Sequence, residues 1–161
     1  MHCADQGVGS DFLGNLFAYL VAYKMPGTSR LERCRALGRH VDAFYEENDV
    51  EDRLKEILPK SFQSEKKKTR PPKLKGNAAT TRALIGFGDL IAKQFLSDGD
   101  PMEAAMKGAA HHLKNCYESL HEANQAFSHT ALYNSSKAFA LQYGALHLAS
   151  GGGVSWKPMP I

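Results

Sequence analysis

SDGDPMEAAMKGAAHHLKNCYESLHEANQAF, residues 97–127, carries the clearest structural pattern in this chain. Asp100 followed by Pro101 is typical of a helix N-cap and the first helical residue after it. Apolar residues then recur at spacings that alternate between four and three, which is typical of the contact seam between antiparallel helices. The seam consists of Met102, Met106, Ala109, Leu113, Cys116, Leu120, Ala123 and Phe127. The stretch therefore predicts a long helix that packs against a second helix.

Helical spacing of apolar residues extends over most of the remaining chain. It predicts further helices over residues 11–24, 28–44, 48–58, 77–96 and 130–149. The first three are preceded by side chains that suit an N-cap, namely Ser10 or Asp11, Thr28 or Ser29, and Asn48 or Asp49. No segment shows the period-two alternation of a strand, so we predict an all-α fold.

Length and composition indicate a folded protein rather than a disordered one. The chain has 161 residues, of which 43% are hydrophobic, enough to bury a core. We expect two packed helical subdomains, residues 1–58 and residues 77–161 with the C-terminal tail. A basic loop at 59–76 and the linker helix after it would join them.

The sequence predicts a cytosolic or nuclear setting. No apolar run approaches the roughly 18 to 20 residues of a membrane span, and the N-terminus, MHCADQGVGSDF, lacks the segments of a secretory signal. The three cysteines, Cys3, Cys34 and Cys116, include no CxxC pair, which argues against a disulfide framework and a cysteine zinc site. We therefore expect reduced thiols.

Positive charge is concentrated in residues 59–76, PKSFQSEKKKTRPPKLKG. This segment carries seven lysines and arginines against Glu65 alone, whereas the whole chain has a net charge of only +3. A compact basic segment on an acidic body predicts contact with a polyanion, either nucleic acid or anionic lipid head groups. The candidate residues are Lys66, Lys67, Lys68, Arg70, Lys73 and Lys75. The alternative is a loop that is merely solvated.

An acidic patch lies where the second and third predicted helices meet. It comprises Glu46, Glu47, Asp49, Glu51 and Asp52. We interpret it as a possible oligomer face, because it complements the basic segment of a neighbouring copy. The alternative is that it forms an acidic first turn that complements the dipole of the third helix.

Motifs of catalysis are missing from the sequence, so we expect neither an enzyme nor a cofactor. There is no P-loop, dinucleotide fingerprint, nucleophile elbow or HExxH. Glu118 and His121 have the spacing of half a di-iron site, but a second copy is lacking and an exposed pair is the simpler interpretation. His111, His112, His121 and His129 would need to converge as three or four ligands to hold zinc, and a solvated histidine face is the alternative. No metal site is expected.

Four stretches carry a family resemblance. They are AYLVAYKMPGTSRLERCRALGRHVDAFYEENDVEDRLKEILPK (18–60), TTRALIGFGDL (80–90), LSDGDPMEAAMKGAAHHLKN (96–115) and NSSKAFALQYGALHLASGGG (134–153). In this order they resemble the N-terminal domain of orthomyxovirus matrix proteins, of which the influenza protein is the familiar member, over roughly residues 16–153. No single motif is specific, and the order and spacing carry the likeness.

The resemblance implies a viral structural protein that forms a homo-oligomeric layer beneath the envelope. Such a protein binds the anionic phospholipid surface peripherally and bridges it to viral nucleoprotein and RNA. The expected locations are the virion, the host cytoplasm and nucleus, and the inner face of the plasma membrane. The alternative function is a cellular helical-bundle module that binds nucleic acid or acts as an adaptor.

The departures from the influenza pattern point to a thogotovirus-type relative. There, a basic cluster implicated in ribonucleoprotein binding follows the Gly-Asp-Pro turn, whereas the matching stretch here is His111-His112-Leu113-Lys114-Asn115. We therefore assign a possible ribonucleoprotein face or pH switch to His111, His112, Lys114 and His121, since histidine changes charge between about pH 5 and 8. The family also has a further C-terminal region, so this chain is expected to be a fragment of a longer protein.

Overall fold

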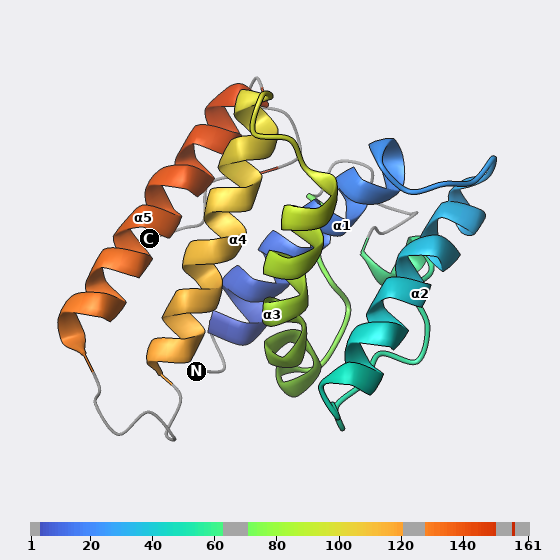
Figure 1. Ribbon diagram of the computed structural model, residues 1–161, viewed down its shortest axis with the longest axis horizontal. Coiled ribbons are helices and arrows are strands. Elements are labelled where there is room, and N and C mark those ends of the chain that lie inside the picture. The colour runs from blue at the N-terminus through green and yellow to red at the C-terminus, as the bar shows by residue number, and fades with distance from the viewer. Residues whose placement is uncertain (1–3, 63–70, 121–127, 151–155, 157–161) are drawn as a thin grey trace. The chain divides into compact units, whose positions relative to one another are not determined.

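The computed structural model describes residues 4–62, 71–120, 128–150 and 156, and all the regular structure within these ranges is helical. The elements are a π-helical turn (Ala4–Gly9), α1 (Ser10–Tyr23), α2 (Arg30–Glu47), a 3-10 turn (Pro59–Ser61), α3 (Ala78–Phe95), α4 (Pro101–Ser119) and α5 (His129–Ala149) (Figure 1). The all-α prediction is confirmed for these residues. None of their helices combines the length and the apolar character that a membrane crossing demands.

The chain divides into two compact units, Met1–Phe87 and Gly88–Ile161, and the boundary lies inside α3. This boundary differs from the predicted division, in which residues 59–76 join two subdomains. Phe62 and Leu74, on either side of the basic segment, are both buried. The described parts of the expected loop therefore belong to the first unit, because each contributes an apolar side chain to its core. The predicted packing of two subdomains stays a prediction.

Among the described elements of the first unit, α1 contributes the most buried apolar residues to the core. Its buried apolar residues are Phe12, Leu13, Leu16, Phe17, Leu20 and Val21. Phe87 of α3 is fully buried, with its ring centroid 5.8 Å from that of Phe17 and 5.5 Å from that of Phe44 on α2. These three aromatic rings hold α1, α2 and the first part of α3 around one apolar centre.

The start of α2 confirms Ser29 as its N-cap. The Ser29 hydroxyl accepts a hydrogen bond from the backbone N–H of Glu32 at 3.1 Å, which forms one half of a capping box. The Glu32 carboxylate completes it by accepting from the Ser29 and Thr28 N–H groups and from the Thr28 hydroxyl. The Thr28 hydroxyl and these N–H groups lower the pKa of Glu32, because they stabilise its charged form.

The first helix starts within one residue of the prediction, but its predicted N-cap is wrong. Ser10 is the first residue of α1 rather than its cap, and its buried hydroxyl donates to the carbonyl of Gly7 at 3.1 Å. The helix continues directly from the π-helical turn before it, and its N-cap position, Gly9, makes no side-chain capping bond. Neither predicted residue caps the helix, because Ser10 and Asp11 both lie inside it.

The predicted third helix at residues 48–58 is also wrong, because these residues are irregular. Asp49 has a φ of 49°, which takes the chain out of helical geometry. Side chains then form hydrogen bonds with backbone N–H and C=O groups that a helix would pair with one another. The N–H of Leu54 donates to the Tyr45 hydroxyl at 3.1 Å, and Arg53 donates to the Val50 carbonyl at 2.6 Å.

In the second unit α4 and α5 lie side by side, as the seam predicts (Figure 1). Asp100 caps α4 by accepting from the N–H groups of Met102 and Glu103 at 2.8 and 3.0 Å, and Ser128 caps α5. Of the predicted seam positions, Met106, Ala109 and Leu113 are buried and Met102, Cys116 and Leu120 are partly buried, while Ala123 and Phe127 lie outside the described residues. The α5 side of this core consists of Phe139, Tyr143 and Leu146, whereas Leu132 is only partly buried.

Two of the three cysteines lie in the described part of the chain. Cys34 and Cys116 are both free thiols. Burial raises the pKa of each, so both are protonated near neutral pH. Cys3 lies outside the described residues.

Candidate functional site

The residues on either side of the central part of the basic segment are hydrogen-bonded to each other within the first unit. The N–H of Lys73 donates to the Phe62 carbonyl at 2.9 Å, and the N–H of Lys75 donates to the Ser61 carbonyl at 2.7 Å. These bonds join the chain entering the segment to the chain leaving it. Lys66, Lys67, Lys68 and Arg70 lie between these two anchored flanks, outside the described residues.

Residues 71–76, which we call the strap, lie against α1. The N–H of Leu74 donates to the Ser10 carbonyl at 2.8 Å, and the Asn15 amide donates to the Pro72 carbonyl at 3.2 Å. Gly14 permits this close approach, because a Cβ there would lie 2.5 Å from the Cα of Lys73. The position of the strap is therefore set by one glycine and two hydrogen bonds of α1.

The strap presents its two lysines to solvent. Lys73 and Lys75 are exposed, whereas Leu74 between them is buried, as expected for an extended chain in which side chains alternate. Lys73 Nζ lies 3.2 Å from Asp11 Oδ1, an exposed pair worth at most about 1 kcal/mol. Lys75 forms no ion pair with any residue in ranges 4–62 and 71–120. Its charge is therefore available to a partner.

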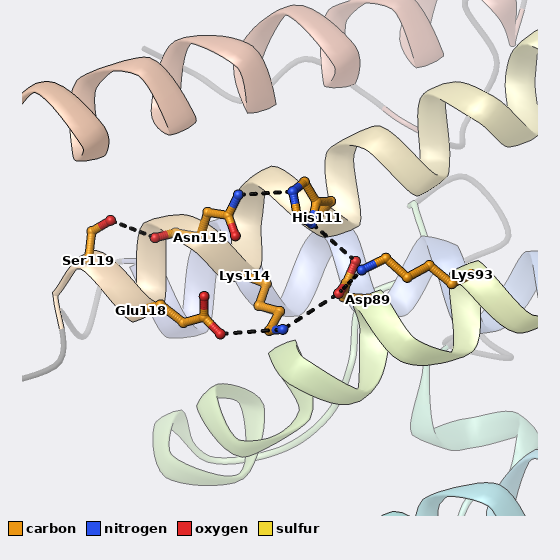
Figure 2. Close-up of polar contacts among 7 residues, drawn as sticks. All are labelled: Asp89, Lys93, His111, Lys114, Asn115, Glu118 and Ser119. Carbon is orange, nitrogen blue, oxygen red and sulfur yellow. Dashed lines mark hydrogen bonds and ion pairs between the residues drawn. The ribbon is translucent and has the colours of Figure 1, made fainter. Parts of the chain in front are cut away.

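In the second unit, His111 and Lys114 of α4 come together around a carboxylate that the sequence analysis missed (Figure 2). Asp89 is buried, and its Oδ2 lies 2.7 Å from Lys93 Nζ and 3.7 Å from Lys114 Nζ. Its Oδ1 lies 3.7 Å from His111 Nδ1. The sequence held a signal: Asp89 is an acidic residue within the apolar run LIGFGDLI, and buried acids are almost always paired.

Asn115 orients the His111 ring. Its amide nitrogen lies 3.1 Å from His111 Nε2, one turn away on α4 (Figure 2). With the amide nitrogen as donor, Nε2 accepts, and the neutral ring carries its proton on Nδ1, facing Asp89. His111 is exposed and also interacts within its own unit, and its assignment to a ribonucleoprotein face or pH switch stays a prediction.

Lys114 has a second partner, and His121 is not described by the structure. Lys114 also forms an ion pair with Glu118 at 3.3 Å (Figure 2). His121 lies outside the described residues. Among the side chains that the structure describes, no group of three or more His, Cys, Asp or Glu converges as metal ligands would.

His112 is partly buried beside His111. Burial lowers its pKa, and the neighbouring His111 lowers it further, because both disfavour a charged ring. The unfolded chain therefore takes up this proton at a higher pH than the folded chain does.

We expect the second unit to lose stability as the pH falls from about 7 to about 5, because protons bind the unfolded chain first near its ordinary histidine pKa of about 6.5. His112→Gln should reduce this loss, and the matched variant His129→Gln, which replaces an exposed histidine of the same unit, should not. Urea unfolding can be followed by fluorescence, since Trp156 is the only tryptophan and is buried beside Tyr143. An unchanged acid response in His112→Gln would contradict the assignment.

The acidic patch lies at the surface of the first unit, and all five of its carboxylates are exposed. The dipole explanation for them is wrong, because no helix begins at Asn48 or Asp49 and residues 48–58 are irregular. Glu46 and Glu47 instead end α2, where negative charge is unfavourable. Glu46 is offset by an ion pair with Arg53. A role as an oligomer face stays a prediction.

The sites described here consist of charged and titratable side chains. Their side chains are exposed lysines, exposed carboxylates and imidazoles held by neighbours, which attract or repel charged partners. No family model, curated protein or solved structure matches the chain.

Proposed function

We propose that this chain is a matrix-type structural domain of a virus, which binds an anionic surface through its basic segment and assembles with copies of itself. One observation carries the proposal. Lys73 and Lys75 are exposed on a strap that α1 holds in place, while the two ends of the basic segment are joined by hydrogen bonds. The family resemblance of the sequence supplies the viral setting.

The anchored flanks favour binding for an entropic reason. A segment whose ends are already joined loses less freedom on binding than a free tail does. Each basic residue near an anionic lipid surface contributes about 1 kcal/mol, and the segment offers six candidates. Because the Debye length is only about 10 Å at 0.1 M salt, the attraction is sensitive to ionic strength.

The proposal implies specific partners and places. The partners are other copies of the chain, anionic phospholipid, and viral nucleoprotein with its RNA. The protein would act beneath the virion envelope, and in the infected cell it would occupy the cytoplasm, the nucleus and the inner face of the plasma membrane.

We expect replacement of Lys66, Lys67 and Lys68 by Ser to weaken binding to phosphatidylserine-containing vesicles at least tenfold, because about 3 kcal/mol of attraction is removed before ordering losses. Co-sedimentation against salt concentration measures this. The control replaces Lys24, Arg30 and Lys137 by Ser, which removes the same charge elsewhere. Equal loss in both variants would show that net charge alone drives binding.

The same preparation separates the two candidate functions. A matrix domain should form ordered layers or tubes on anionic vesicles, visible by negative-stain electron microscopy. A nucleic-acid-binding module or adaptor should bind RNA or a protein partner but leave the vesicles bare and remain monomeric in sedimentation. The second outcome would overturn the proposal.

A further inference from the structure

The first unit contains a pocket of about 240 Å³ that plays no part in the proposed function. It lies between α2 and residues 54–57, the segment predicted to be helical but found irregular. Val41 and Ile57 are buried and form apolar wall, and Arg35, Arg39 and Lys55 contribute cationic side chains. Because residues 54–57 are irregular rather than helical, a hollow lies between them and α2.

The three cations of this pocket, Arg35, Arg39 and Lys55, outnumber its two carboxylates, Asp42 and Glu56. Arg35, Arg39 and Lys55 are exposed, and none forms an ion pair within 4 Å of a carboxylate in the described ranges, although Asp42 and Glu56 line the same pocket. Three cations that share one hollow repel one another unless an anion lies between them. The pocket is therefore electrostatically suited to a negatively charged group.

Gly38 leaves part of this space open. It lies in the interior of α2, where glycine costs up to about 1 kcal/mol relative to alanine. Packing does not require it, because a Cβ at this position would lie 3.7 Å from the Cβ of Ile57, an ordinary contact distance. The absent side chain thus adds to the volume of the pocket rather than to a close helix contact.

We propose that this pocket binds the phosphate group of a small phosphoester. Arginine guanidinium groups pair with phosphate oxygens in a bidentate manner, and Arg35 and Arg39 lie one turn apart on the same helix. Asp42 and Glu56 supply acceptors for an ammonium or hydroxyl group on the same ligand. A volume below the roughly 300 to 1,000 Å³ of drug-sized sites favours a single phosphate with a short polar arm. Phosphoethanolamine has this chemistry, whether free or as a lipid head group.

The test is a calorimetric titration of the whole chain with phosphoethanolamine at constant ionic strength. We expect saturable binding that Arg39→Gln weakens about tenfold, since a charge-assisted hydrogen bond is lost. Gly38→Leu, which fills the pocket but keeps every charge, should weaken it similarly. If Gly38→Leu does not fold, as judged by circular dichroism, Lys55→Gln takes its place. Arg30→Gln, the same charge change on α2 outside the pocket, should bind as the wild type does.

The controls distinguish this site from general attraction and from the proposed function. Equal weakening by Arg30→Gln and Arg39→Gln, or no saturable binding, would overturn the pocket assignment. The variant lacking Lys66, Lys67 and Lys68 should bind soluble phosphoethanolamine normally, so failure of the membrane proposal does not affect this result. Competition by phosphatidylethanolamine vesicles would identify a lipid head group as the source, and its absence a free phosphoester; both support the pocket.

Discussion

Phe87→Ala is expected to lower the free energy of unfolding of the first unit by about 3–5 kcal/mol, the usual cost of deleting a buried phenylalanine. The ring is fully buried and contacts both Phe17 and Phe44, so its removal leaves a cavity between three helices. A loss of this size amounts to a large share of the stability of a typical domain.

Urea unfolding followed by circular dichroism measures the effect of Phe87→Ala. Leu90→Ala is the control on the same helix, because Leu90 is 47% exposed and its loss should cost far less. Phe87→Leu should recover part of the stability, since leucine fills part of the same volume. Similar midpoints for Phe87→Ala and Leu90→Ala would show that the aromatic cluster is not the centre of this core.

Gly14→Ala is the second change with a large expected effect, a loss of about 2–4 kcal/mol that combines overpacking with displacement of the strap. The added Cβ would lie 2.5 Å from the Cα of Lys73 and 2.6 Å from the N of Leu74, so backbone must move. Movement of the strap exposes Leu74. It also breaks the hydrogen bond from the Asn15 amide to the Pro72 carbonyl and the one from the Leu74 N–H to the Ser10 carbonyl. The gain in helix propensity, up to about 1 kcal/mol, offsets only part of this.

Two glycine controls make the Gly14 result specific. Gly144→Ala in α5 has nothing within 4 Å of the new Cβ, and Gly86→Ala in α3 meets only Phe44 Cζ at 3.7 Å. Both should be neutral or stabilising, because alanine is the better helix former. Thermal unfolding separates the three variants. A Gly14→Ala protein as stable as the other two would mean that the strap is not held against α1.

The helices themselves were largely predictable from sequence because their signals are local. The four-three seam and the Asp100-Pro101 start lie within one stretch, and they predict the start of α4 and its contact with a second helix. Ser29 and Glu32 are three residues apart and define the capping box of α2. Such patterns depend on the geometry of a single helix, and all the residues that form them are close together in the sequence.

The candidate sites were predictable only in part. Lys73 and Lys75 were expected at the surface and lie there, but the strap that holds them depends on Gly14, more than fifty residues earlier in the chain. His111 and Lys114 were singled out, whereas Asp89, the carboxylate between them, was not. Both omissions concern partners that only folding brings together.

By itself, the sequence determined the helical class, most helix bounds and the location of the positive charge. The tertiary structure decided where the chain is irregular and which residues meet at the sites, because local and distant partners compete for the same hydrogen-bonding groups. Residues 48–58 have apolar spacing that suits a helix, yet the hydroxyl of Tyr45 and the side chain of Arg53 take over their backbone hydrogen bonds. A buried backbone group forms a hydrogen bond with a partner near it in the fold, which can be a side chain. Helical periodicity in the sequence predicts only the bonds within a helix.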